Sequence, residues 1–115
     1  MSHTEIGEIT RICKALSDPT RLRIFLFLTK KNFCVNAIVN FLGISQPAVS
    51  QHLKILREAD LVRTERQGYW VHYSANLERI REFMDVLFKV VKAEKGKMPF
   101  AKVNMRYLTA EKNIK

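Results

Sequence analysis

The chain has 115 residues, of which 47% are hydrophobic and 27% are charged, and this composition is typical of a single globular domain. It argues against a membrane span, because no run approaches the roughly 18 uninterrupted apolar residues that a span requires, and the first residues lack the basic and apolar regions of a signal peptide. We therefore expect a cytoplasmic protein, and the net charge of +9 favours a polyanionic partner such as nucleic acid.

Two helices are predicted before residue 30. Apolar residues recur with the helical period between residues 4 and 16, where they are Ile6, Ile9, Ile12, Cys13 and Leu16. Cys13 lies on that apolar face, and we expect it to be a small buried side chain. Asp18 followed by Pro19 is typical of a helix start, since Asp caps the first turn and Pro suits its first position. The second helix runs to about Leu28, and we expect its apolar residues to be mostly buried; they are Leu22, Phe25, Leu26 and Leu28.

A third helix and a tight turn come next. Val35, Ile38 and Leu42 again have helical spacing, and Gly43 directly after them is typical of a helix C-terminus, because glycine adopts the left-handed conformation without strain. Only one residue separates that glycine from Ser45, which can cap a following helix. This order is the sequence form of a helix-turn-helix, whose second helix, the recognition helix, enters the DNA major groove.

The predicted recognition helix, residues 45–56, has one apolar side and one polar side. At about 100° per residue, Val49, Leu53 and Leu56 point one way. The opposite side carries Pro47, Gln51 and Lys54, with Ser50 at its margin. Side chains of Gln, Ser and Lys supply donors and acceptors that reach base edges and phosphates. We therefore predict that this polar side contacts DNA.

After residue 60 the apolar period changes from helical to alternating. Residues 61–65 and 69–74 are rich in Val, Thr, Tyr and Trp, and Arg66, Gln67 and Gly68 between them have the composition of a hairpin turn. An antiparallel hairpin directly after a recognition helix is a wing. We expect its basic and polar residues, Arg63, Arg66 and Gln67, to lie along the phosphates or in a minor groove.

A last long helix is predicted from Asn76, which can cap it, to about Lys95. Its apolar residues cover more than half of its circumference, and this stripe is wider than packing within one small domain needs. The same helix of a second copy would cover such a face. We therefore predict a homodimer through this helix and the first one, with Ile6, Ile9, Ile80, Met84, Leu87, Phe88 and Val91 at the interface.

The basic residues are unevenly distributed along the chain. Residues 45–74 contain four Lys or Arg against three Asp or Glu, whereas residues 96–115 contain five against one. We divide the chain into a DNA-binding and dimerisation domain, residues 1–95, and a basic C-terminal extension, residues 96–115. The extension either lies over the dimer or adds phosphate contacts.

Four segments in a fixed order resemble the winged-helix repressors of the ArsR family, which respond to arsenic and other metals. Residues 15–24 resemble the junction of the family's first two helices, residues 45–53 with Leu56 its recognition helix, residues 59–62 the exit from that helix, and residues 68–74 its wing. The resemblance spans more than half of the chain. It implies a fold that is mainly α with a small β-hairpin (α+β), a winged helix-turn-helix in which four helices, a hairpin and a fifth helix follow one another.

The resemblance also implies a homodimeric repressor that binds an inverted-repeat operator in its own promoter region and is released by an inducer. Carried over position by position, the DNA-facing residues are Ser45, Gln46, Ala48, Ser50, Gln51, His52 and Lys54 on the helix and Arg63, Arg66 and Gln67 on the wing. His52 has a second interpretation, because helical spacing puts it beside Val49 and Leu53. It would then pack against the domain or support the turn.

The sequence leaves the inducer open. Family members that bind thiophilic metals at the start of the third helix use a Cys-Val-Cys run, because soft ions take two or three thiolates, whereas this chain has Cys34, Val35 and Asn36. A second family site uses carboxylate and His ligands on the last helix, and residues 76–95 contain no histidine. The interpretations that stay open are a thiophilic metal or metalloid at Cys34, oxidation of Cys34 and Cys13, a small organic ligand, or no inducer. No cofactor is certain.

An enzyme is not expected, since the chain has no Gly-rich phosphate loop, no paired carboxylates in a predicted cleft, and no Ser or Cys with a nearby base. Two other kinds of protein stay open. A non-specific architectural DNA-binding protein would use the net charge without sequence preference. A winged helix that binds only another protein would have no DNA affinity at low salt.

Overall fold

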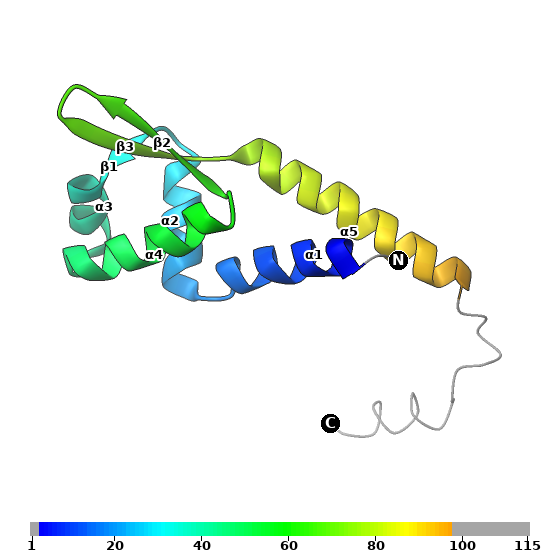
Figure 1. Cartoon of the computed structure of the whole chain (residues 1–115). Coiled ribbons are helices and arrows are strands. Elements are labelled where there is room, and N and C mark those ends of the chain that lie inside the picture. The colour runs from blue at the N-terminus through cyan, green and yellow to red at the C-terminus, as the bar shows by residue number, and fades with distance from the viewer. Residues whose placement is uncertain (1–2, 98–115) are drawn as a thin grey trace, which may run out of the picture.

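A computed structural model describes residues 3–97 as a helical domain with a small antiparallel sheet (Figure 1). The elements, in chain order, are α1 (His3–Leu16), α2 (Pro19–Leu28), β1 (Phe33–Cys34), α3 (Val35–Leu42), α4 (Gln46–Glu58), β2 (Val62–Gln67), β3 (Trp70–Ala75) and α5 (Leu77–Lys97). The five predicted helices and the hairpin are confirmed, and α5 extends two residues beyond its predicted end. The proposed extension lies almost entirely outside the described residues.

The sheet contains one strand that the sequence did not predict. Its order is β1-β3-β2, and β1 pairs with β3 so that Phe33 lies opposite Tyr73 and Cys34 lies opposite His72. A two-residue strand has no detectable alternation, and only its pairing with β3 defines it. This strand joins the start of α3 to the wing.

The hairpin turn begins two residues later than predicted. Arg66 and Gln67 belong to β2, opposite Val71 and Trp70, and the turn consists of Gly68 and Tyr69. Gly68 has a φ of 65°, which fits a two-residue hairpin loop with glycine at its first position. The prediction that Arg66 and Gln67 form the turn was therefore wrong, although both side chains are exposed on the wing.

Side-chain caps begin three of the helices, as the sequence predicted. An Asp18 carboxylate oxygen accepts a hydrogen bond from the Arg21 backbone N–H at 2.9 Å. Ser45 Oγ accepts one from the Ala48 backbone N–H at 3.3 Å. The buried Asn76 accepts one from the Arg79 backbone N–H at 3.3 Å. Such caps satisfy backbone donors that the first helical turn leaves without partners.

The core lies where α1, α2, α3, α4 and the first residue of β2 meet. Ile12, Ile24, Leu28, Ile38 and Leu61 have at most 1% of their surface exposed. Helix α4 contributes to this core the three residues of its predicted apolar side, Val49, Leu53 and Leu56. The buried side of α4 is therefore the side that the sequence predicted.

Two predictions of burial were wrong. Cys13 is exposed, because α1 packs inward through Ile12 and Ala15, and Cys13 lies on another flank of the helix. On α2, Phe25 and Leu28 are buried, but Leu22 and Leu26 are 38% and 53% exposed.

Among the described residues, no helix is both long enough and apolar enough to span a membrane.

Candidate nucleic-acid interface

Opposite its buried face, α4 presents an exposed polar side. Pro47, Gln51 and Lys54 are all exposed, in agreement with the prediction. At the start of the helix, Gln46 donates from Nε2 to Ser50 Oγ at 3.0 Å. Ala48 is half-buried. Gln51 and Lys54 are therefore free to meet a ligand that approaches α4 from outside, and Ser50 lies beside them.

His52 lies on the flank of α4 that faces α2. Arg21 Nη1 donates to His52 Nδ1 at 3.3 Å, and His52 Nε2 lies 4.0 Å from an Asp18 carboxylate oxygen. These partners indicate the tautomer with its proton on Nε2. The side chain is only 21% exposed. The geometry thus favours the second interpretation of His52, a residue that fixes α4 against the start of α2.

The Asp18 carboxylate in this cluster is electrostatically stabilised. The hydrogen bond from the Arg21 backbone N–H holds the pKa of Asp18 below its ordinary value of 3.8, and the electrostatic influence of the His52 ring and the Arg21 guanidinium acts in the same direction. Partial burial opposes them. The negative charge of Asp18 therefore contributes to the folded state.

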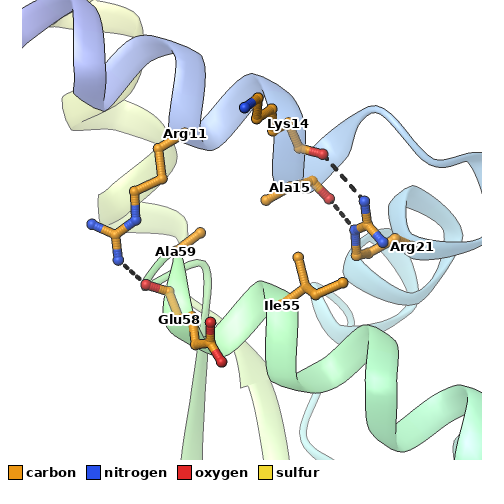
Figure 2. A pocket seen from close by; sticks show the side chains of 7 residues that line it. All are labelled: Arg11, Lys14, Ala15, Arg21, Ile55, Glu58 and Ala59. Atoms are coloured by element: carbon orange, nitrogen blue, oxygen red, sulfur yellow. Dashed lines mark hydrogen bonds between the residues drawn. The ribbon is translucent and has the colours of Figure 1, made fainter.

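On the same flank, a cavity of about 270 Å³ lies between α1, α2 and α4 and is lined by Arg11, Lys14 and Arg21 among others (Figure 2). The guanidinium groups of Arg11 and Arg21 bind backbone oxygens at helix ends. Arg21 donates to the backbone oxygens of Ala15 at 2.6 Å and Lys14 at 3.2 Å, and Arg11 donates to that of Glu58. Because the last carbonyls of a helix lack intrahelical donors and carry partial negative charge, these arginines neutralise the C-terminal ends of α1 and α4.

The opposite flank of α4 faces the wing. A cavity of about 140 Å³ lies there, lined by Ser50, Leu53, Lys54, Arg57 and Tyr73. Neither Arg57 nor Tyr73 was predicted from the sequence as a site residue. The helical spacing of Ser50, Lys54 and Arg57 would have placed Arg57 on this flank, but only the packing of the hairpin against α4 brings Tyr73 to it.

The wing carries exposed cations and an exposed aromatic side chain. Arg63 lies 3.7 Å from the Glu78 carboxylate, and both side chains are more than half exposed, so this ion pair is weak and leaves Arg63 accessible. Tyr69, at the turn, is 98% exposed and was not among the predicted wing residues. The wing thus offers Arg63, Arg66, Gln67 and Tyr69 to a ligand.

Cys34 lies in β1 and is half-buried. The strand register puts it opposite His72, whose Nδ1 lies 2.7 Å from Asn32 Oδ1. The described residues contain no group of three Cys, His, Asp or Glu side chains that could hold a metal ion. Since soft metals and metalloids take two or three thiolates, Cys34 with its neighbours in one chain does not fit such a site.

The predicted dimer residues lie on α1 and α5. Met84, Leu87, Phe88 and Val91 are exposed on α5, with Phe88 at 70%, and Ile6 is 40% exposed on α1. Ile9 and Ile80 are half-buried, and Ile80 packs against the core. An Arg79–Glu8 ion pair and a 3.2 Å Lys89–Glu5 ion pair join the two helices. The long apolar face of α5 is therefore open beyond the part that α1 covers.

Residues 18–64, from the start of α2 into β2, match the family model described as bacterial regulatory protein, arsR family. An uncharacterized HTH-type transcriptional regulator of Methanocaldococcus jannaschii is 36% identical over 77 residues, which are 66% of this chain and 86% of that protein. The chain belongs to the ArsR family. The arsenic resistance transcriptional regulator ArsR1 of Pseudomonas putida is also 36% identical, over 70% of this chain and 62% of its own length.

Solved structures agree with the fold over most of the chain. An ArsR-like transcriptional regulator from Rhodococcus sp. RHA1 matches with a TM-score of 0.74 over 95% of this chain and 93% of that one, at 24% identity. A homodimeric winged helix-turn-helix DNA-binding domain from Mycobacterium bovis matches with a TM-score of 0.64 over 82% and 89% of the two chains, at 28% identity. The winged helix-turn-helix predicted from the sequence is thus confirmed.

Proposed function

We propose that this member of the ArsR family is a homodimeric transcriptional repressor that binds an inverted-repeat operator in its own promoter region. The observation that carries the proposal is the exposed polar side of α4, which is anchored by one buried face and followed directly by a wing. A helix held in this way can enter a major groove while the hairpin reaches the adjacent minor groove.

Two kinds of DNA contact are assigned to different residues. Gln51 contacts base edges, because an exposed amide can bind adenine through two hydrogen bonds. Around Gln51, the DNA-facing residues of the helix are Ser45, Gln46, Ala48, Ser50 and Lys54. The wing contacts the DNA backbone through Arg63, Arg66 and Gln67. His52 acts indirectly, by holding α4 against Arg21 and Asp18.

The exposed face of α5, with Ile6 beside it on α1, supports assembly of two copies. Isologous pairing of this face would cover Met84, Leu87, Phe88 and Val91 on both copies. The two recognition helices would then meet half-sites one or more helical turns apart. The homodimeric domain from M. bovis offers a precedent within the same fold.

The test is a titration of the chain with DNA from its own upstream region and with random DNA of equal length. We expect a preference of about 10³ or more for one inverted repeat, with two chains bound per repeat. Gln51→Ala should cost about 1–3 kcal/mol at one base pair of each half-site, whereas Arg66→Ala should weaken binding to all sequences alike.

Three outcomes would contradict the proposal. Equal affinity for random and upstream DNA would indicate an architectural protein. Absence of DNA binding at low salt would indicate a protein-binding winged helix. Equal losses on specific and random DNA for both variants would remove α4 as the recognition helix.

A further inference from the structure

We propose that the cavity between α4 and β3 holds one phosphate of the DNA backbone, clamped by Lys54, Arg57 and the hydroxyls of Ser50 and Tyr73. This inference rests on the proposed function and adds residues and a ligand group to it. We call these four residues the phosphate clamp.

The chemistry of the cavity fits a phosphate. Its volume is about 140 Å³, and it combines two cationic and two hydroxyl side chains around the buried Leu53. Ser50 Oγ accepts a hydrogen bond from Gln46, so its own proton is available to an acceptor. All four polar groups can therefore donate to phosphate oxygens.

Among the described residues, the two cations of the clamp have no protein partner, in contrast to the two arginines of the larger cavity. Among residues 3–97, neither Lys54 nor Arg57 forms a hydrogen bond or an ion pair through its side chain. Arg11 and Arg21 already bind helix carbonyls (Figure 2). An anion would thus gain new charge-assisted hydrogen bonds at the clamp but would compete with existing ones at the larger cavity.

The position of the cavity follows the geometry of a duplex. A recognition helix in a major groove and a wing in the adjacent minor groove stand on either side of the sugar-phosphate strand that separates the two grooves. The space between α4 and the wing is where that strand must pass. Lys54 belongs both to the exposed side of α4 and to this cavity, so the cavity adjoins the side proposed to contact DNA.

Both walls of the clamp are fixed before DNA arrives. Tyr73 lies in the central strand, opposite Phe33 of β1 and Thr64 of β2, and packs against the core. Across the cavity, α4 is anchored by the buried Leu53 and Leu56. A phosphate held between two rigid elements would set the register of the whole domain on the duplex, which is what phosphate contacts supply.

The test uses operator duplexes in which one phosphate at a time is replaced by a neutral methylphosphonate. For the wild-type chain we expect one position per half-site, between the helix-contacted and wing-contacted base pairs, where replacement weakens binding about 10-fold. Arg57→Ala should lose about 10-fold on the unmodified operator and should lose clearly less than the wild type at that position, since the methylphosphonate then removes only the contacts of the remaining clamp residues. Its salt dependence should also fall by about one phosphate contact.

Arg81→Ala is the matched control, because Arg81 is an exposed arginine on α5. It should stay sensitive to methylphosphonate at the same position, and Arg57→Lys should recover part of the affinity.

Additive losses of Arg57→Ala and methylphosphonate at every position would overturn the clamp, even if the wild type prefers its operator. Unchanged operator affinity of Arg57→Ala, with lower stability, would assign Arg57 to the C-terminal end of α4 instead. A wild type without operator preference would refute the proposed function itself.

Discussion

The cationic side chains on the two flanks of α4 differ in their hydrogen-bond partners. On the flank that faces α1 and α2, Arg11 and Arg21 bind the backbone oxygens at the ends of α1 and α4. On the flank that faces the wing, Lys54 and Arg57 line a cavity with two hydroxyls and bind no other described residue. The larger cavity is the structural one, and the smaller cavity is the one suited to an anion.

This difference shows why net charge alone does not locate a DNA surface. Of the cations near α4, those with carbonyl or carboxylate partners contribute to the fold, because charged hydrogen bonds within a protein stabilise it by more than neutral ones. Cations without such partners add little to folding and can neutralise phosphates. The hydrogen-bond partners of each arginine thus separate the two roles.

Arg21→Ala should have the largest effect and should act on stability. It removes hydrogen bonds to the Ala15 and Lys14 carbonyls and to His52, and we expect a loss of about 2–3 kcal/mol in the free energy of unfolding. Urea denaturation followed by circular dichroism measures it. Arg57→Ala is the paired variant, and its unfolding free energy should change by less than about 0.5 kcal/mol. The reverse order of the two losses would contradict the structural role of Arg21 and the absence of such a role for Arg57.

Tyr73→Phe should have a smaller effect and should act on binding. The ring stays packed against the core, while the clamp loses one hydroxyl, so we expect about 0.5–1.5 kcal/mol weaker operator binding. Stability should stay the same, because the hydroxyl has no partner among the described residues. Fluorescence of Trp70, the only tryptophan of the chain, measures both, since it lies in β3, the strand that carries Tyr73. Loss of stability with unchanged affinity would place the hydroxyl outside the clamp.

The sequence predicted what depends on local pattern. The helical periods predicted five helices, and Gly43 predicted the turn before α4. Ser45 and Asn76 were predicted to cap helices, and the structure confirms both caps. It did not predict features that depend on contacts between distant segments. β1 exists only through its pairing with β3, Tyr73 reaches the clamp only because the hairpin packs against α4, and His52 meets Arg21 only through the packing of α2 on α4.

Cys13 is a second case in which the sequence pattern alone did not determine the structure, because its predicted burial is not observed. Its helical position is compatible with the apolar face of α1, yet the neighbouring elements cover Ile12 and Ala15 and leave Cys13 exposed. A period identifies a face, but the width of the face that becomes buried depends on the elements packed against it. For α5, that excess width is the basis of the proposed dimer.

Asp18→Asn should have the smallest effect, and it tests whether the α2 flank contributes charge to stability. Asparagine keeps a capping oxygen but removes the negative charge beside Arg21 and His52. The pKa of Asp18 is lowered in the folded chain, so the unfolded chain binds a proton first as pH falls, and the stabilisation by the charge is present above about pH 4 and lost below it. The stability difference between wild type and Asp18→Asn should therefore shrink in acid, as measured by urea denaturation at a series of pH values. A difference that stays constant through this range would show that the cap, and not the charge, is what Asp18 contributes. Operator affinity at neutral pH should change little, because this flank positions α4 without contacting DNA.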